Sequence, residues 1–157
     1  MEKGRTNMAE IRFRAPKEKD RAVYTRLMEA FYNTDAVLSP LPPEYYQKTF
    51  DEILKEGPYF RGFLFEIDEE VVGFGQISFR FGSEVAGIEC WFEDLYVQES
   101  HRNKGICGRF IDYIKASFPA ARYRLEVEEE NVGAVALYKK KGFRFLPYKQ
   151  MICDRKE

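Results

Sequence analysis

Histidine and cysteine, the side chains that most often hold transition metals, are scarce in this sequence, with one histidine and three cysteines among 157 residues. Cys90, Cys107 and Cys153 are odd in number, widely spaced and form no CxxC pair. The sequence therefore predicts neither a disulfide framework nor a metal site. Unpaired thiols persist in reducing compartments, so we expect a cytoplasmic protein.

Long apolar runs and an excess of one charge are also lacking. No stretch approaches the roughly 18 apolar residues that would span a bilayer, and residues 1–10 contain no apolar segment, so no membrane partner is expected. The 25 Lys and Arg nearly balance the 26 Asp and Glu, and a net charge of -1 supplies no long-range attraction for a phosphate backbone. A nucleic-acid partner is therefore disfavoured.

Apolar residues are plentiful, at 45% of the chain, which suffices for a domain with a sizeable core. We expect a single domain over residues 1–157, with a loose start at residues 1–9. Apolar residues that alternate with polar ones predict strands, and apolar residues that recur every three or four positions predict helices. Strands are expected at residues 11–15, 60–67, 71–81, 88–97, 123–128 and 143–153, and helices at residues 24–31, 43–54, 105–118 and after 131. This order predicts a mixed sheet flanked by helices.

The segment between the fourth expected strand and the next helix has the composition of an anion site. Gly105 and Gly108 let a backbone approach a pyrophosphate closely, and Arg102 and Lys104 add positive charge. N–H groups at a helix start point outward, and the helix dipole favours negative charge there. An ordinary glycine-containing turn is the alternative. The single histidine, His101, precedes this loop, and we expect it to cap or line the loop rather than to serve a hydrolase triad.

Two motifs follow each other along the chain. The first is Glu93-Asp94-Leu95-Tyr96-Val97 followed by Arg102-Asn103-Lys104-Gly105-Ile106-Cys107-Gly108, which resembles a strand ending in Val and the loop (Q/R)xxGx(G/A). The second runs from Asn131 to Phe143 and is similar to the pattern NxxAxxLYxxxGF. In this order, the two motifs resemble those of the GNAT family of acyl-CoA-dependent N-acetyltransferases. Cys107 stands where the family has Gly or Ala, and because cysteine is small we expect it to act as a buried filler.

The resemblance implies a GNAT-like α/β fold, with a mixed, mostly antiparallel central sheet flanked by helices, that binds acetyl-CoA as co-substrate. It implies that residues 102–108 hold the pyrophosphate and that Asn131 contacts the cofactor arm. Backbone N–H groups of Leu95, Tyr96 and Val97 are implied to serve the thioester carbonyl and the pantetheine arm. Tyr138 matches the family's general acid, and a homodimer is a further implication. Simple packing of Tyr138 and helix capping by Asn131 remain open as structural roles.

An alkyl ammonium must lose a proton before it attacks a thioester, an obstacle of about 4 to 5 kcal/mol at pH 7. Glu93 and Asp94 end the strand that leads into the loop, and either is a candidate base, directly or through one water. Adjacent strand residues point to opposite faces unless a bulge turns one of them, and Glu93 is our preferred candidate. A solvated carboxylate pair and a water relay without a dedicated base are the alternatives.

The acceptor is predicted from carboxylates near the expected cleft. Glu93, Asp94, Glu126 and Asp35 favour a small cationic amine, such as a diamine or polyamine, because a cation gains charge-assisted hydrogen bonds between them. The stretch at residues 92–94 also resembles diamine and polyamine acetyltransferases. A protein N-terminus or lysine is the alternative acceptor, and a non-catalytic CoA-binding module is the alternative function.

Overall fold

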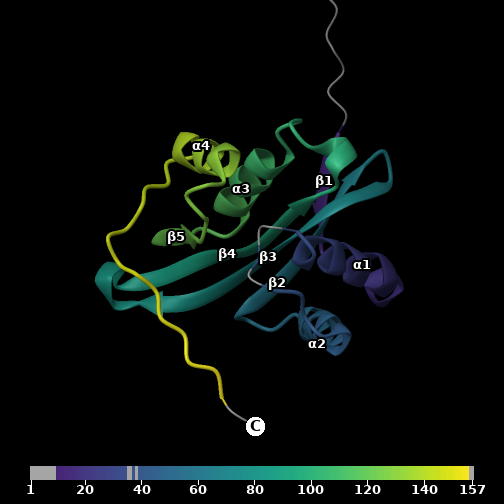
Figure 1. The fold of residues 1–157 in the computed structure, drawn as a ribbon, viewed down its shortest axis with the longest axis horizontal. Coiled ribbons are helices and arrows are strands. Elements are labelled where there is room, and N and C mark those ends of the chain that lie inside the picture. Colours follow the sequence, from purple (N-terminus) through teal and green to yellow (C-terminus); the bar gives the residue numbers. More distant parts are fainter. Residues whose placement is uncertain (1–9, 35–36, 38, 156–157) are drawn as a thin grey trace, which may run out of the picture.

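Five strands form one sheet in the computed structural model of the chain, which describes residues 10–34, 37 and 39–155 (Figure 1). Strand order follows the sequence, with antiparallel pairing from β1 to β4 and parallel pairing of β4 with β5. The strands are β1 (Ile11–Arg14), β2 (Phe60–Ile67), β3 (Glu70–Gly82), β4 (Gly87–Val97) and β5 (Arg122–Leu125), and the helices are α1 (Arg21–Tyr32), α2 (Pro43–Leu54), α3 (Ile106–Ser117) and α4 (Val132–Lys140). The predicted fold class is confirmed. The expected loose start at residues 1–9 lies outside the described residues.

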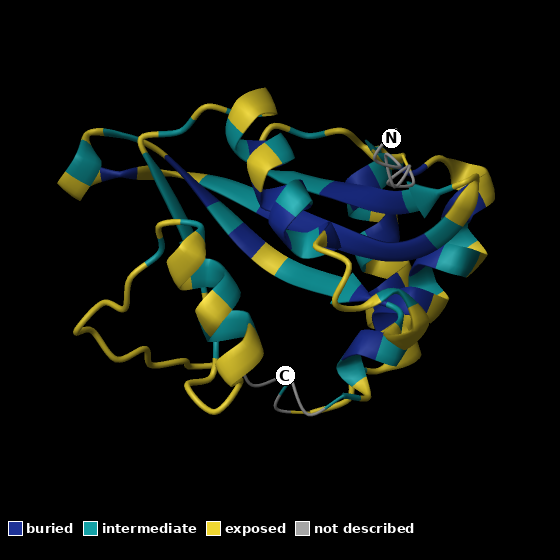
Figure 2. Cartoon of the chain, turned by 90° about the horizontal axis from the view of Figure 1, so that it is seen from above, coloured by how far each residue is buried: buried dark blue, intermediate teal, exposed yellow. Residues whose placement is uncertain are grey.

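Helices cover both faces of the sheet, which explains why its central strands bury apolar residues on both faces. α1 and α2 lie on one face and α3 on the other (Figure 1). In β2, Phe63 and Phe65 pack in the core beneath α3, whereas Leu64 between them packs with α1 and α2. Because both sets are buried, residues 62–65 of β2 form a continuous apolar run and not an alternating one. Figure 2 shows that buried positions (dark blue) gather in the middle strands of the sheet.

A β-bulge interrupts the pairing of β3 with β4 beside the predicted site. Leu95 pairs with Gly75 and Phe92 pairs with Ile77, so two residues of β4, at positions 93–94, lie opposite one residue of β3. Phe92 and Leu95 both pack in the core beneath α3. The two carboxylates between them can therefore both face the α1 side, which a regular strand would not allow.

β4 and β5 pair over a short stretch and then diverge. The parallel ladder joins residues 89–92 to residues 122–125 and ends there. β4 continues to Val97, whereas β5 ends at Leu125, before the predicted end at Glu128, because the chain beyond Leu125 leaves β4 and has no ladder partner. Within the described chain, no strand pairs with the outer edge of residues 93–97, so this edge borders an opening.

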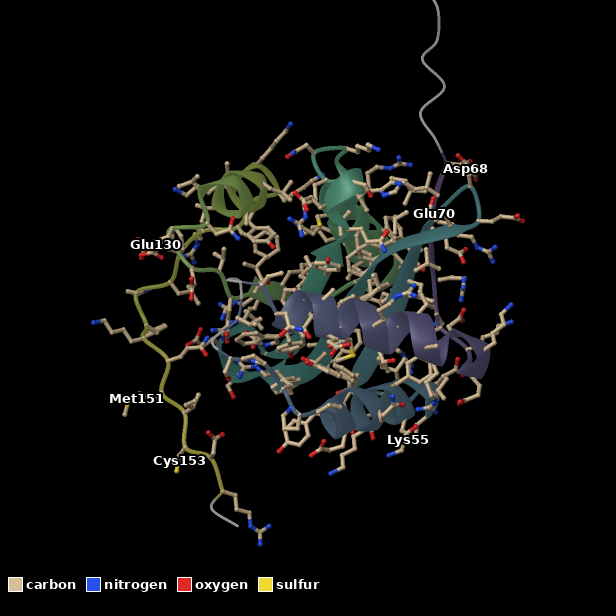
Figure 3. All side chains as sticks on the ribbon, turned by 45° about the vertical axis from the view of Figure 1, so that its right-hand side comes forward. Lys55, Asp68, Glu70, Glu130, Met151 and Cys153 are labelled. Atoms are coloured by element: carbon tan, nitrogen blue, oxygen red, sulfur yellow. The ribbon has the colours of Figure 1, made fainter. Side chains whose placement is uncertain are left out.

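The strand predicted at residues 143–153 is wrong. This segment forms no strand and runs along the outside of the molecule (yellow in Figure 1). Pro147 lacks a backbone N–H, and β5 offers only 4 residues of edge, so the alternating apolar side chains find no ladder. Tyr148, Met151 and Ile152 are 70%, 95% and 81% exposed. Figure 3 shows Met151 and Cys153 on this outer segment.

Candidate active site

The loop ahead of α3 has the geometry of an anion-binding turn. Asn103 and Gly105 have positive φ angles of 60° and 74°. The first helical hydrogen bond runs from the Arg109 N–H to the Gly105 carbonyl (3.0 Å), so the N–H groups of residues 106–108 have no carbonyl partner within the helix. These donors and the helix dipole together favour a negatively charged group. A Cβ at position 105 would meet no atom within 4 Å, so the space beside the loop is open.

Of the two cations predicted in this loop, Arg102 is held by β4. Its Nε donates to the Val97 carbonyl (2.9 Å), and its guanidinium lies 5.7 Å from the centroid of the Tyr96 ring. Lys104 is exposed. Arg102 therefore fixes the loop against the end of β4, and Lys104 contributes positive charge at the surface.

A cleft of about 380 Å³ opens where β4 and β5 diverge. Its walls come from β4, from the chain after β5 and from the first turns of α4, and they include Glu93, Leu95, Asn131 and Tyr138. Both sequence motifs thus contribute predicted residues to one cleft. Asn131 caps α4, because its Oδ1 accepts a hydrogen bond from the Ala134 N–H (3.2 Å), which confirms the structural role left open for it.

Burial keeps the two titratable side chains between α3 and α4, Tyr138 and Cys107, in their neutral forms. Burial raises the pKa of Tyr138 to about 12, and the neighbouring Cys107 adds to the rise. Burial also raises the pKa of Cys107 to about 11, against the opposing charge of Arg102. The Tyr138 hydroxyl is therefore a proton donor at neutral pH, and the Cys107 thiol lacks the thiolate character of a nucleophile.

The bulge separates the two adjacent carboxylates into different environments. Asp94 is partly buried and accepts a hydrogen bond from the Tyr32 hydroxyl (2.9 Å). Burial raises the pKa of Asp94 to about 6, the Tyr32 hydrogen bond lowers it, and the charge of Glu93 raises it. Glu93 is exposed and accepts a hydrogen bond from the Ser78 hydroxyl. A base should titrate near the working pH, so this geometry favours Asp94 over Glu93, our preferred candidate from the sequence.

Tyr32 is a site residue that sequence reasoning missed. The apolar stripe that predicts α1 includes Phe31 but not Tyr32, and nothing in the local pattern connects Tyr32 with a carboxylate on β4. The one available signal is that Tyr32 lies off the apolar stripe of α1. Its large aromatic side chain must therefore pack against residues other than those that the stripe contacts. Its ring also packs against Phe31, with centroids 5.1 Å apart.

A larger pocket of about 1000 Å³ adjoins the cleft and extends around β5, from the end of α1 to Lys115 of α3. It is bounded by the end of α1, the segment before α2, β4, β5, α4 and the outer C-terminal segment. Glu93, Glu126 and Tyr138 line both the pocket and the cleft, so the two spaces meet at these residues. Asp94 lines the pocket as well. Asp35, predicted to border the acceptor, lies outside the described residues.

Other chemistries find little support in the part of the chain that the structure describes. No group of three or more His, Cys, Asp or Glu side chains there is placed to hold a metal ion. His101 Nδ1 is 2.9 Å from the hydroxyl of the adjacent Ser100, in the turn between β4 and the loop. Among the described helices, none has the length and apolar character needed to cross a bilayer.

Comparison with known proteins agrees with this geometry. The model of the acetyltransferase (GNAT) family matches residues 21–143. The comparison with curated proteins gave no match.

Solved structures with a similar fold include acetyltransferases of several kinds. A possible acetyltransferase from Clostridium difficile 630 is similar with a TM-score of 0.78 and 20% identity, over 94% of this chain and 99% of that chain. The aminoglycoside N-acetyltransferase AAC(6')-Iy in complex with CoA has a TM-score of 0.73 and 17% identity, over 96% of this chain and 97% of that chain. A ribosomal-protein-alanine N-acetyltransferase from Brucella melitensis biovar Abortus 2308 has a TM-score of 0.71 and 15% identity, over 93% of this chain and 100% of that chain.

Proposed function

Since this chain belongs to the GNAT acetyltransferase family, we propose that it transfers the acetyl group of acetyl-CoA to the amine of a small cationic acceptor by direct attack in a ternary complex. The observation that carries the proposal is the meeting of two spaces at one group of side chains. The cleft beside β4 suits the thioester arm, and the larger pocket suits the acceptor. Glu93 and Tyr138 lie at their junction, and Asp94 lies on the pocket wall.

The cofactor follows the path from the α3 loop to the cleft. The N–H groups of residues 106–108 and the charge of Lys104 are suited to the pyrophosphate. The unpaired edge of β4, with Leu95, Tyr96 and Val97, offers backbone groups to the pantetheine arm, and Asn131 lies on the opposite wall. No metal takes part in this proposal.

Three groups of the chain accept the amine proton, stabilise the developing charge and donate a proton to the leaving thiolate. Asp94, or Glu93 in its place, accepts the proton of the ammonium, so that the amine can attack the thioester carbonyl. A backbone N–H in residues 95–97 stabilises the charge that develops on the carbonyl oxygen. Tyr138 donates its hydroxyl proton to the departing thiolate, which suits a phenol that burial keeps protonated.

A small cationic acceptor is favoured by the carboxylates on the pocket wall, Glu93, Asp94 and Glu126, because an ammonium group gains charge-assisted hydrogen bonds between them. A protein N-terminus or lysine remains the alternative acceptor, because the same groups would serve its amine. A panel of diamines, polyamines and lysine-containing peptides, assayed for thiol release, should give the highest kcat/KM with the small amines. Peptides that outperform every small amine would reject this acceptor class.

CoA binding should be visible as thermal stabilisation. At about 100 times its dissociation constant, CoA is expected to stabilise the fold by about 2.7 kcal/mol and to raise Tm by about 5 to 10 °C. Gly105→Val should abolish this rise, because valine disfavours the φ of 74° that places the loop amides. Gly142→Val is the matched control, since Gly142 also has a positive φ, of 90°, and no atom within 4 Å of an added Cβ. Equal loss of the CoA effect in both variants would reject the loop assignment.

We also propose a cytoplasmic homodimer. The free thiols of Cys90, Cys107 and Cys153 support the compartment. The outer C-terminal segment supports the dimer, because Met151 and Ile152 are 95% and 81% exposed, as expected for apolar side chains that a second copy covers. Light scattering coupled to size exclusion should give a dimer mass at micromolar concentration, and Met151→Ser with Ile152→Ser should shift it towards the monomer. A monomeric parent protein would contradict the dimer.

A further inference from the structure

The sheet face on the α1 side becomes polar towards β5, beyond the reach of α1 and α2. Glu89 and Trp91 of β4 lie on this face, because the intervening Cys90 packs in the core beneath α3. Arg122 and Arg124 of β5 are their register partners. This polar face forms one wall of the larger pocket, at the end away from the bulge.

A buried carboxylate organises the arginines of this face. Glu89 is 1% exposed and accepts from Arg80 Nε at 2.7 Å and Arg122 Nη1 at 3.2 Å, with Arg124 Nη1 farther away at 3.8 Å. Burial alone would raise the pKa of Glu89, but the Arg80 hydrogen bond and the charges of all three arginines lower it, so Glu89 is ionised. Arg122 also pairs with Glu84 at 2.8 Å. Three guanidinium groups therefore face two carboxylates, which leaves one positive charge in excess.

Arg124 is the most loosely paired of the three arginines, with Glu89 at 3.8 Å as its ion-pair partner. Within the described chain its guanidinium makes no hydrogen bond, and its distance to Glu89 is the longest of the three arginines. The guanidinium lies 4.3 Å from the centroid of the Trp91 ring, and the side chain is 22% exposed on the pocket wall. Stacking on the ring holds the planar group in place while its N–H donors stay available, which is how arginine recognises carboxylates.

The opposite end of the same wall is acidic. Glu93 lies two residues beyond Trp91 on β4, about 6 to 7 Å along the strand, and Asp94 follows it at the bulge. Lys115, another cation of this pocket, is committed elsewhere, because its Nζ donates to the Lys141 carbonyl (2.8 Å). The pocket thus presents a proton-accepting end and an anion-binding end on one strand pair.

We propose that the acceptor carries a carboxylate that binds Arg124 while its amine reaches Asp94, which assigns the acceptor to the aliphatic amino acids with a terminal side-chain amine. The inference rests on the proposed function and names the substrate class for the same site. A diamino acid keeps the net positive charge proposed for the acceptor and places its carboxylate several bonds from the reacting amine. In the transfer, Asp94 takes the ammonium proton, the side-chain amine forms the N–C bond and the thioester C–S bond breaks. Tyr138 protonates the departing CoA thiolate, and the second proton that the amine nitrogen loses as it becomes an amide restores the Tyr138 hydroxyl.

The test compares acceptors that differ only in the carboxylate. L-lysine is paired with 1,5-diaminopentane and L-ornithine with 1,4-diaminobutane, for the parent protein and for Arg124→Gln. The parent should favour the amino acid of each pair by about 10-fold or more in kcat/KM, because a charge-assisted, two-point contact is worth about that factor. Arg124→Gln should lower kcat/KM for the amino acids by about 10- to 100-fold, leave the diamines within about 3-fold, and leave the CoA-induced rise in Tm unchanged. Arg124→Lys should restore part of the preference.

Two results would overturn the proposal. One is a parent protein that prefers the diamines, and the other is Arg124→Gln lowering both members of a pair equally. Calorimetric titration of L-lysine into the CoA-bound protein separates this inference from the proposed function. If Arg124→Gln weakens the binding of L-lysine by about 10-fold or more, but the separate assay with acetyl-CoA shows no thiol release, the carboxylate site is supported and the transfer is rejected. Thiol release with diamines but no measurable affinity for either amino acid would reject the carboxylate site and retain the transfer.

Discussion

Asp94→Asn is expected to lower kcat/KM for amine acetylation by about 100-fold or more, because a positioned base typically contributes 10²- to 10⁴-fold. In the parent protein, burial holds the pKa of Asp94 at about 6, so kcat/KM should rise with pH through about 6 as the carboxylate ionises. In Asp94→Asn the rise in kcat/KM near pH 6 should disappear. kcat/KM should then increase only at higher pH, where the amine loses its proton without a base. The measurement is the pH profile of kcat/KM with a fixed small amine.

Glu93→Gln is the matched control, since it neutralises the adjacent carboxylate of the same bulge. Glu93 is exposed, so its neutralisation should reduce kcat/KM by less than about 10-fold, chiefly through weaker attraction of the ammonium. A large loss in Glu93→Gln with little change in Asp94→Asn would assign the base to Glu93. Unchanged rates and pH profiles in both variants would indicate a water relay without a dedicated base.

Unfolding measurements show whether Asp94→Asn remains folded, and they carry an expectation of their own. The folded pKa of Asp94, about 6, lies above the ordinary value of 3.8, so ionisation costs stability as pH rises through this window. Asp94→Asn removes that cost and should stabilise the fold at pH 7 by up to about 3 kcal/mol, with the gain vanishing below about pH 4. An Asp94→Asn variant that is both less active and less stable at pH 7 than the parent protein would contradict the raised pKa of Asp94.

Tyr138→Phe should reduce kcat by about 10- to 1,000-fold while CoA affinity changes by less than about 2-fold. The substitution removes the proton donor for the thiolate and preserves the ring that packs 6.0 Å from Phe143. Tyr45→Phe removes a hydroxyl from an exposed position on α2 and is the control for unspecific effects. Rapid-quench turnover, under conditions where chemistry limits the rate, is the measurement. Undiminished turnover in Tyr138→Phe would reject the role of general acid.

The fold was predictable where burial leaves a pattern in the sequence. β2 spans Phe60–Ile67 as predicted, because burial on both faces produces an apolar run and the two residues after it form a tight turn. The same reasoning failed at residues 143–153, where apolar side chains alternate but Pro147 and the short edge of β5 leave them without a partner strand. Periodicity indicates which face a strand would bury and does not show whether a neighbouring strand is present.

The site was predictable in its residues more than in its contacts. The loop glycines, Tyr138 and both carboxylates are recognisable from two motifs, and the family they predicted is confirmed. The bulge that turns both carboxylates to one side is invisible in the sequence. So is the hydrogen bond from Tyr32 to Asp94, which joins residues 62 positions apart. The burial that raises the pKa of Asp94, and so reverses the preference between Glu93 and Asp94, is equally invisible. The stacking of Arg124 on Trp91 likewise depends on strand register.

Release of free CoA thiol from acetyl-CoA, measured with and without a small amine and paired with mass spectrometry of the amine, tests the central claim most directly. The proposal predicts thiol release that requires the amine, saturates with both substrates in an intersecting initial-velocity pattern, and matches the acetylated amine one for one. Thermal stabilisation by CoA without amine-dependent thiol release would contradict it and identify a non-catalytic CoA-binding module. A burst of thiol before amine is added would contradict direct transfer and indicate an acetylated enzyme.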